Sequence, residues 1–376
     1  MEFYKFFKMR NKLIIVVLVA LVSGCANTEQ NSAEFKNIVL KKNENVEVLS
    51  RFVSDLDYIE LKYPADSLIG PIESLKLLGD DIIIKQRNTN KLNYLRFSGN
   101  GQFLNKIGTD SESVSLQTPQ DILKYDDKFA IWDQAGVHAL SASGKYLGKI
   151  FNTRQTGNSF FYSRNNFYLF HESKGPGYLS KYTRDGKLSE VYKSGKKEMD
   201  DLNYSRVIEV EKDSFHLFSP INDTIFSFSQ EQLSPKYLIQ GKSYPTFVNV
   251  LQEISALDDT EKLKYLHNNK HWVIKRYLEN RNFIFVVYRL ASDSHYLIIR
   301  KSDWKTTYFG RAINDIDGGI WDYPMFLSDD DELYIPLGTY QISGHKMMNK
   351  RRFEFEEVIE RNLENHSPVI MKCKLK

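Results

Sequence analysis

Short apolar runs recur along the chain and are joined in pairs by acidic or amide turns. Residues 75–78 and 82–84 flank such a turn, and the same pattern recurs around residues 125–127, 164–166 and 211–213. Short runs of β-branched and aromatic residues on both sides of a turn signal predict a β-hairpin. We therefore expect the first two strands of a repeated unit at each of these four places.

A second pattern gives the length of the repeated unit. Phe97–Ile107 has two further copies downstream, which place Gly101, Gly144 and Gly186 at one equivalent position. Glycine at this position can supply the positive φ of a tight hairpin turn. A period of about 42 residues with four short strands per unit is typical of a β-propeller blade. The alternative, a β-sandwich with similar hairpins, does not require a fixed period.

The fold class that we expect is all-β, a six-bladed β-propeller with two partly helical insertions. The final segment Val369–Leu375 is expected to pair with the early strand Tyr58–Tyr63, which would close the ring and remove two sheet edges. The insertions are residues 245–280, where apolar residues follow helical spacing, and the charged segment 339–366. The six blades are expected at residues 68–108, 116–151, 158–193, 203–240, 270–310 and 322–375.

The N-terminal segment, residues 1–24, predicts a lipoprotein signal peptide. Basic residues up to Lys12 precede an apolar run from Leu13 to Val22, as in a secretory signal. About ten apolar residues rise only about 15 Å as a helix, half of a hydrocarbon core, so a transmembrane anchor is not expected. Val22-Ser23-Gly24-Cys25 resembles a bacterial lipobox, in which Cys25 becomes the lipidated residue. The alternative is a plain signal peptide followed by a chance cysteine.

The predicted anchor leads to a division of the chain into three parts. Residues 25–50 are rich in polar side chains and predict a flexible tether, and residues 51–376 predict the propeller. Several acyl chains on Cys25 would hold the protein on a membrane. We expect a lipid-anchored protein of the bacterial cell envelope, at the outer membrane, on its periplasmic face or on the surface.

Composition and charge limit the kinds of partner that this protein is expected to bind. Aromatic residues make up 13% of the chain, a bias that favours β-structure. The two cysteines are Cys25 and Cys373, so lipidation of the first leaves no disulfide within the monomer. The net charge of +3 resides in the signal segment, and the mature chain has 47 basic and 47 acidic residues. A neutral chain lacks the electrostatic footprint of a nucleic-acid binder, so no nucleic-acid partner is expected.

Several segments are similar to one group of proteins. They are Asp57–Leu61, Gly99–Gly108, Asp317–Gly319 with the following Tyr323-Pro324, and Ser367–Lys376. In these segments the chain resembles the six-bladed β-propeller lipoproteins of Bacteroidota, which are NHL-like propellers. The resemblance covers essentially the whole mature chain. It implies the propeller fold but no activity and no catalytic residues, because a fold does not determine a function.

The lengths of the predicted connections indicate which face of the ring would bind a ligand. First-to-second and third-to-fourth connections of a blade share one face and are short here, whereas the connections of the other face are long. Functional residues gather on long loops. An exposed tryptophan beside a carboxylate could hold a sugar, whereas the alternative for Trp132, at a strand end, is packing within the blade structure. The candidate binding rim consists of Arg87, Trp132, Asp133, His171, Glu172, Trp321, Asp322 and His345.

Sequence motifs for enzyme chemistry are missing. The sequence contains no G-x-S-x-G elbow, phosphate-binding glycine loop or H-E-x-x-H zinc motif. Asn314–Gly319 resembles the start of a calcium loop, but Phe326 occupies the position of the bidentate acid counted from Asp315, so an EF-hand is excluded. We expect no cofactor, with a looser calcium site as the alternative.

The function expected from these observations is non-enzymatic. The propeller would bind or scaffold a protein or glycan ligand through its long-loop face. The alternative is a propeller-type hydrolase or lyase with acid and base residues at the mouth of the central channel. A third interpretation is a structural subunit of a larger envelope assembly. Ligand identity, the sidedness of the anchor and the oligomeric state are not determined by this sequence.

Overall fold

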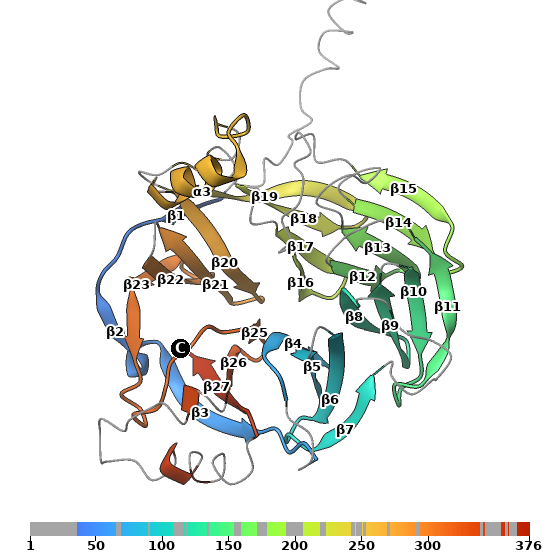
Figure 1. Cartoon of the computed structure of the whole chain (residues 1–376), viewed down its shortest axis with the longest axis horizontal. Coiled ribbons are helices and arrows are strands. Elements are labelled where there is room, and N and C mark those ends of the chain that lie inside the picture. The colour runs from blue at the N-terminus through green and yellow to red at the C-terminus, as the bar shows by residue number, and fades with distance from the viewer. Residues whose placement is uncertain are drawn as a thin grey trace, which may run out of the picture. The chain divides into compact units, whose positions relative to one another are not determined.

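The described residues form antiparallel β-sheets that are arranged as the blades of a ring (Figure 1). The ring is built by the unit Asn37–Lys376. The computed structural model describes residues 36–64, 69–88, 91–107, 116, 119–133, 135–153, 159–170, 179–192, 206–218, 223–241, 245, 250, 253–268, 271–290, 293–338, 341–342, 355–357, 360 and 367–376.

Blades 1 to 3 each consist of four consecutive strands. They are β4 (Ile72–Leu78), β5 (Asp81–Asn88), β6 (Lys91–Ser98) and β7 (Phe103–Ile107) in blade 1; β8 (Asp121–Tyr125), β9 (Lys128–Asp133), β10 (Gly136–Leu140) and β11 (Tyr146–Asn152) in blade 2; and β12 (Ser159–Ser163), β13 (Asn166–Phe170), β14 (Leu179–Thr183) and β15 (Leu188–Tyr192) in blade 3.

Blades 4 and 6 each include an early strand of the chain, whereas blade 5 consists of four consecutive strands. The strands are β16 (Arg206–Glu211), β17 (Ser214–Phe218), β18 (Thr224–Ser229), β19 (Gln232–Gly241) and β1 (Lys36–Leu40) in blade 4; β20 (Trp272–Glu279), β21 (Phe283–Leu290), β22 (Asp293–Arg300) and β23 (Lys305–Phe309) in blade 5; and β25 (Phe326–Leu327), β26 (Glu332–Leu337), β27 (Val369–Leu375) and β3 (Val53–Glu60) in blade 6. The six predicted blades are thereby confirmed.

Aromatic side chains fill the spaces between neighbouring blades. Phe161 of blade 3 stacks on Phe215 of blade 4, with ring centroids 4.1 Å apart. Trp132 of blade 2 meets Phe160 of blade 3 edge-on at 6.0 Å. Because each blade packs on both of its faces, a strand such as β21 is buried along almost its whole length. The high content of tyrosine and phenylalanine therefore serves the packing of blade against blade.

The ring is closed by pairing of the C-terminal strand with an early strand, as expected. Strand β27 pairs antiparallel with β3, and Met371 lies opposite Tyr58. The early strand begins at Val53 and ends at Glu60, so it starts earlier than the predicted Tyr58–Tyr63. Residue Leu61 follows β3 and donates its backbone N–H to Pro368 O at 3.0 Å. Closure therefore joins the two ends of the propeller through a full strand pair.

The prediction that residues 25–50 form a flexible tether is wrong for the second half of this segment. Strand β1 adds a fifth strand to blade 4 beside β19, and β2 (Val46–Val48) runs parallel to β24 (Arg311–Ile313). A short 3-10 helix, η1 (Leu49–Arg51), then leads into β3. The physical reason is burial, because Ile38 and Leu40 are each 1% exposed in the core between blades 4 and 5.

The predicted insertion at residues 245–280 is shorter than expected. It contains the helix α3 (Asp259–Asn268), and Val250 and Ile254 of the helically spaced apolar set are buried. The first strand of blade 5 begins at Trp272, inside the predicted insertion. In the second insertion, Phe355 is buried and its ring lies 5.7 Å from that of Tyr58. No helix among the described residues has the length and apolar character needed to cross a membrane.

The repeated glycines occupy left-handed turn positions, as predicted. The φ angles of Gly101, Gly144 and Gly186 are 83°, 82° and 82°. A Cβ atom at Gly101 would also lie 2.0 Å from the carbonyl oxygen of Glu60, at the junction of blades 1 and 6. The repeat therefore conserves a backbone conformation that side chains rarely adopt.

We expect Gly101→Ala to lower the free energy of unfolding by about 1–3 kcal/mol. The left-handed conformation is strained for alanine, and the contact with Glu60 must also be relieved. The measurement is urea denaturation of the mature chain. Gly338→Ala is the control, because among the described residues a Cβ at Gly338 would meet just Gln341 Oε1, at 3.4 Å. Equal, small losses in both variants would contradict the prediction.

Candidate functional site

The connections of the ring differ in length at its two ends. Within a blade the strands alternate in direction, so first-to-second and third-to-fourth turns share one end, which we call the tight-turn end. The other end, called here the long-loop end, carries the blade-to-blade connections, such as residues 193–205 and 242–271. This division follows the prediction, with one correction. The second-to-third connections at residues 89–90, 134–135 and 291–292 are as short as the turns of the opposite end.

The predicted pair Trp132–Asp133 does not form an exposed rim. Trp132 is 0% exposed and packs between blades 2 and 3. Asp133 is 1% exposed, and its Oδ1 accepts a hydrogen bond from Gly136 N at 3.0 Å and lies 2.9 Å from His138 Nε2. Trp132 is buried between blades and Asp133 is buried within blade 2, so neither presents a surface to a sugar.

The side chains of the second predicted pair, Trp321–Asp322, mainly contact other residues of the protein. Trp321 is partly buried, and its ring lies 5.9 Å from Phe52 and 6.2 Å from Tyr296. The carboxylate of Asp322 accepts a hydrogen bond from the amide of Gln341. Trp321 therefore contributes to the core between blades 5 and 6.

Arg87 is exposed near the end of β5, at the long-loop end. Its Nε lies 2.6 Å from Glu73 Oε1, so its charge is neutralised by a neighbouring strand of the same blade. Four predicted residues lie outside the part of the chain that the structure describes: Cys25, His171, Glu172 and His345.

A chain of hydrogen bonds crosses the innermost strands of blades 1 to 4, which Figure 1 shows nearest the ring axis. Lys76 Nζ on β4 lies 2.5 Å from Asp121 Oδ1 on β8. Asp121 Oδ2 accepts a hydrogen bond from Ser159 Oγ on β12 at 2.9 Å. Ser159 Oγ in turn accepts one from Val207 N on β16 at 3.1 Å. Asp121 is buried, and it holds three blades together around the axis.

Six basic side chains interact electrostatically with this chain of hydrogen bonds or with one another. We call them the inner basic cluster. Each interacts electrostatically with Asp121 or with another basic residue of the set. All of them come from the first two strands of blades 1, 4 and 5. The members are Lys76, Lys85, Arg206, Lys275, Arg276 and Arg289.

The pKa values of three members of the cluster are lowered, mainly by burial and partly by neighbouring cations. Burial, together with the nearby Arg276, lowers the pKa of Arg206 to about 10, although Asp121 opposes the shift. Burial lowers the pKa of Lys85. Burial and the charges of Arg289 and Arg276 lower the pKa of Lys275. For Lys85, the acids Asp121 and Glu73 oppose this shift.

Strand β16 carries charges of opposite sign toward its two ends. Arg206 is its first residue, at the long-loop end, whereas Glu209 lies closer to the tight turn. Burial raises the pKa of Glu209, and the acids Asp329 and Asp213 raise it further. On β4 the order is reversed, because Glu73 lies nearer the long-loop end than Lys76 does.

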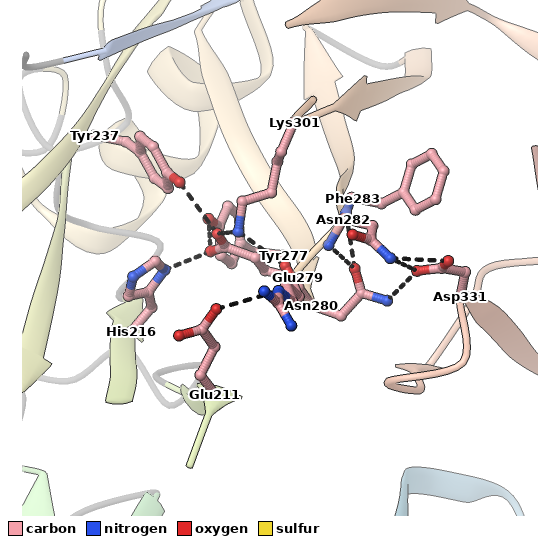
Figure 2. A network of polar contacts seen from close by, with 11 residues as sticks. Glu211, His216, Tyr237, Tyr277, Glu279, Asn280, Asn282, Phe283, Lys301 and Asp331 are labelled. Atoms are coloured by element: carbon pink, nitrogen blue, oxygen red, sulfur yellow. Dashed lines mark hydrogen bonds and ion pairs between the residues drawn. The ribbon is translucent and has the colours of Figure 1, made fainter. Parts of the chain in front are cut away.

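A second polar network lies between blades 4 and 5 and is centred on Glu279 (Figure 2). Its carboxylate lies 2.6 Å from His216 Nδ1 and 2.7 Å from Lys301 Nζ. Tyr237 OH donates to Glu279 Oε1 at 3.2 Å, and Tyr277 OH also donates to the carboxylate. Glu279 is 2% exposed at the end of β20. A buried carboxylate with four donors is a structural joint between two blades.

The network continues into the turn that joins β20 to β21. Asn280 Oδ1 accepts hydrogen bonds from the backbone N–H groups of Asn282 and Phe283, at 2.9 and 2.7 Å. The amide nitrogens of Asn280 and Asn282 both reach Asp331 of blade 6, as Figure 2 shows. Blades 4, 5 and 6 are thus connected at the tight-turn end. This places the network away from the inner basic cluster.

Stability is expected to fall below about pH 4.3, in part through Glu279. Burial alone would raise its pKa, but His216 and Lys301 more than reverse this effect, so the pKa is lowered. Such a group stabilises the fold fully above its unfolded pKa, and this contribution is lost as the pH falls through the folded pKa. Urea denaturation at about pH 7 and about pH 3 should show a larger loss in the wild type than in Glu279→Gln. Equal losses would contradict the prediction.

The turn that was the alternative candidate for a calcium site uses its carboxylate oxygens in hydrogen bonds within the protein. Asp317 Oδ1 accepts a hydrogen bond from Gly319 N at 2.9 Å, and Oδ2 accepts one from Tyr58 OH at 2.6 Å. Asn314 Nδ2 also donates to Asp317. Within the described ranges, no group of three or more histidine, cysteine, aspartate or glutamate residues could hold a metal ion. The expectation that no cofactor is needed stays a prediction.

Comparison with known proteins identifies the family. The family described as "Domain of unknown function (DUF4934)" matches residues 35–374, nearly the whole ring. The chain belongs to this family. None of the curated proteins matches it in sequence. The match begins one residue before β1, which agrees with the inclusion of that strand in blade 4.

One solved structure shares the fold of this DUF4934 chain, and two others are similar to it at lower TM-scores. A putative exported protein of Bacteroides fragilis is 15% identical with a TM-score of 0.73, and the match covers 91% of this chain and 100% of that chain. A Bacteroides thetaiotaomicron protein of unknown function is 8% identical with a TM-score of 0.49, covering 86% and 76%. The extracellular domain of a putative one-component system of Bacteroides thetaiotaomicron is 12% identical with a TM-score of 0.41, covering 75% and 41%.

Proposed function

We propose that this protein is a lipid-anchored binding module of the bacterial envelope, which takes a protein or glycan ligand at the long-loop end of the ring axis. The observation that supports the proposal is the inner basic cluster, in which six basic side chains from blades 1, 4 and 5 interact with Asp121 or with one another. Side chains of the same charge are held together at an energetic cost, so a role in binding explains why they meet.

Binding explains the site better than hydrolysis or elimination does. A general acid or base must be able to exchange a proton with the substrate. Asp121 already accepts hydrogen bonds from Ser159 Oγ and from the backbone of Ile122 and Phe160, and it pairs with Lys76. This carboxylate positions the strands around it, and its contacts favour the binding module over the alternative of a propeller-type hydrolase or lyase.

The anchor is proposed from the sequence around Cys25. Val22-Ser23-Gly24-Cys25 resembles a lipobox, and an exported protein of Bacteroides fragilis has the same fold. Metabolic labelling with a clickable fatty acid would test it. We expect labelling and membrane fractionation of the wild type, and loss of both in Cys25→Ser. Labelling that persists in the variant would refute the anchor without affecting the proposed ligand site.

The binding function is tested by a thermal-shift screen of the mature chain carrying Cys25→Ser. The panel contains neutral and acidic oligosaccharides, peptidoglycan fragments, peptides, calcium and EDTA. A ligand at about 100 times its dissociation constant stabilises the fold by about 2.7 kcal/mol, which moves the midpoint by degrees. A shift that disappears when the inner basic cluster is altered supports the proposal. A shift that is unchanged in such variants would place the site elsewhere.

A further inference from the structure

Strands β2 and β24 form a small parallel pair, and β2 lies at the outer side of the ring (Figure 1). In their register Val46 is opposite Arg311 and Val48 is opposite Ile313, so these four side chains share one face. Val46, Val48 and Ile313 are 53%, 37% and 46% exposed. The other face is turned toward the protein, because Ala312 is buried there. The pair therefore presents three aliphatic side chains and one arginine to the outside.

Exposed leucines elsewhere on the described part of the ring are separated from one another. Leu104, Leu147 and Leu188 lie on β7, β11 and β15, the outermost strands of three different blades, so no strand pairing brings them together. Apolar residues that are exposed singly are normal on a protein surface, whereas a contiguous group marks a place of contact. The face of the β2–β24 pair is therefore the apolar surface that calls for an explanation.

The size of this face favours a lipid surface over a protein partner. Each strand has three residues, so the pair is about 10 Å long. A stable protein–protein interface covers about 800 Å² on each partner, far more than such a pair offers. A protein that is already tethered to a membrane needs only a weak additional contact, because the tether keeps the surface at a high effective concentration.

The predicted lipid anchor can reach the membrane beside this face. Cys25 precedes Lys36, the first residue of β1, by eleven positions, which span at most about 36–40 Å. Val46 follows Lys36 by ten positions and therefore lies within about 33–36 Å of it. The tether is thus long enough for the acylated Cys25 to enter a membrane on which Val46 rests.

The side chains of the face match the chemistry of a membrane surface. Aliphatic groups are stable at the boundary between the lipid headgroups and the acyl chains. Arg311 is exposed and forms no ion pair with the residues that the structure describes, so its guanidinium is available to lipid phosphate groups. Glu47 belongs to the opposite face and pairs with Arg51, and Glu44 pairs with Lys42.

We infer that this face rests on the lipid surface to which Cys25 anchors the protein, with Val46, Val48 and Ile313 at the boundary of the acyl chains and Arg311 at the phosphate groups. The inference rests on the proposed lipid anchor and adds the surface by which the propeller lies on the membrane. Because β2 lies at the outer side of the ring, contact there leaves the long-loop end, with the proposed ligand site, uncovered by the membrane.

The test places an environment-sensitive dye on the face of a tethered protein. The mature chain carries Cys25→Ser, a histidine tag before residue 25 and Val48→Cys, and a nickel-chelating lipid holds it on vesicles of phosphatidylcholine and phosphatidylglycerol. The dye reacts at position 48, because Cys373 is buried. We expect a blue shift of the dye emission on the vesicles, and quenching by nitroxide-labelled lipids. The artificial tether makes this result independent of lipidation at Cys25.

The matched position for the dye is residue 147, in a chain with Leu147→Cys in place of Val48→Cys. Leu147 is 53% exposed, as Val46 is, but it lies on β11 of blade 2. We expect neither a blue shift nor quenching at this position. A tethered protein without a preferred face would give the same signal at both positions.

Two pairs of substitutions, with the dye at position 48, test the aliphatic side chains. Val46→Thr with Ile313→Thr should lose the quenching, because threonine keeps the β-branched shape but carries a polar hydroxyl group. Leu104→Thr with Leu188→Thr changes two leucines of similar exposure and should keep it. Thermal unfolding of each variant without vesicles checks the fold.

Each other outcome overturns the inference in a distinguishable way. Absence of quenching at position 48, or equal quenching at positions 48 and 147, refutes the membrane face but leaves the anchor and the ligand site. A soluble chain that is dimeric, and that Val46→Thr with Ile313→Thr makes monomeric, would assign the face to a second copy. Fatty-acid labelling that persists in Cys25→Ser refutes the anchor, and the inference fails with it.

Discussion

Glu279→Gln is expected to lower the free energy of unfolding by about 3–5 kcal/mol, the largest effect of any substitution considered. The glutamine has the shape of the glutamate but lacks its charge, so Lys301 and His216 lose their anionic partner between blades 4 and 5. Lys301 Nζ also donates to Asn280 O at 2.8 Å, which holds it at the site. Removal of one member of a buried ion pair leaves the other without compensation.

The measurement is urea denaturation of the mature chain at neutral pH. Glu211→Gln is the matched control, because Glu211 pairs with Arg281 of blade 5 at 3.6 Å while the side chains are 59% and 79% exposed. An exposed pair contributes about 0–1 kcal/mol, so this variant should lose little stability. The same small loss in both variants would show that the Glu279 network does not join the two blades.

Leu40→Ala is expected to lower the free energy of unfolding by about 2–5 kcal/mol. Leu40 lies on β1, which adds a fifth strand to blade 4, and it is 1% exposed among the apolar side chains between blades 4 and 5. Alanine removes apolar contacts and leaves a cavity that the surrounding strands cannot fill completely. The loss would come from a residue that the sequence pattern assigns to a flexible tether.

The control for this prediction is Val46→Ala in the same segment. Val46 lies on β2 and is 53% exposed, so its truncation should change stability by no more than about 0.5 kcal/mol. Urea denaturation of both variants gives the comparison. If Leu40→Ala were as mild as Val46→Ala, residues 36–40 would be dispensable, and the propeller would be stable without its fifth strand in blade 4.

The segment that contains β1, β2 and β3 does more than close the ring. Tyr308 OH donates to Val39 O at 2.8 Å, and Tyr288 OH donates to Lys41 O at 2.6 Å. Both tyrosines belong to blade 5, whereas β1 pairs in blade 4 and β3 in blade 6. One short segment therefore contacts three consecutive blades. In a ring whose blades otherwise contact only their neighbours, such a segment adds cohesion where the chain ends meet.

The Glu279 network and the inner basic cluster differ in how well their polar groups are paired. The Glu279 carboxylate accepts or pairs with several donors and joins blades at the tight-turn end. The inner basic cluster contains Arg289 Nε, a buried donor without a partner among the described residues. A satisfied polar network rigidifies a fold, whereas unsatisfied charge is tolerated where a ligand supplies the partner. This contrast separates the structural network from the candidate binding site.

The propeller was predictable from local patterns in the sequence. A strand shows either alternating apolar and polar residues or a short continuous apolar run. A tight turn requires particular residues, such as Gly101. Both signals are therefore visible within about ten residues of the sequence. The repeat of these signals gives the number of blades. Pairing of Val369–Leu375 with an early strand followed from the need to close the ring. These features depend on short-range chemistry and on a period, which a single sequence contains.

The candidate site was not predictable in the same way. Lys76, Asp121, Ser159 and Arg206 lie in four different repeats and show no common spacing, yet the ring places them side by side. The sequence likewise did not show whether Trp132 is exposed or buried, because this depends on how tightly blades 2 and 3 pack. Convergence and burial are properties of contacts between distant segments. The sequence therefore determined the blades, their turns and their closure, and only the tertiary structure decided which side chains meet at the axis.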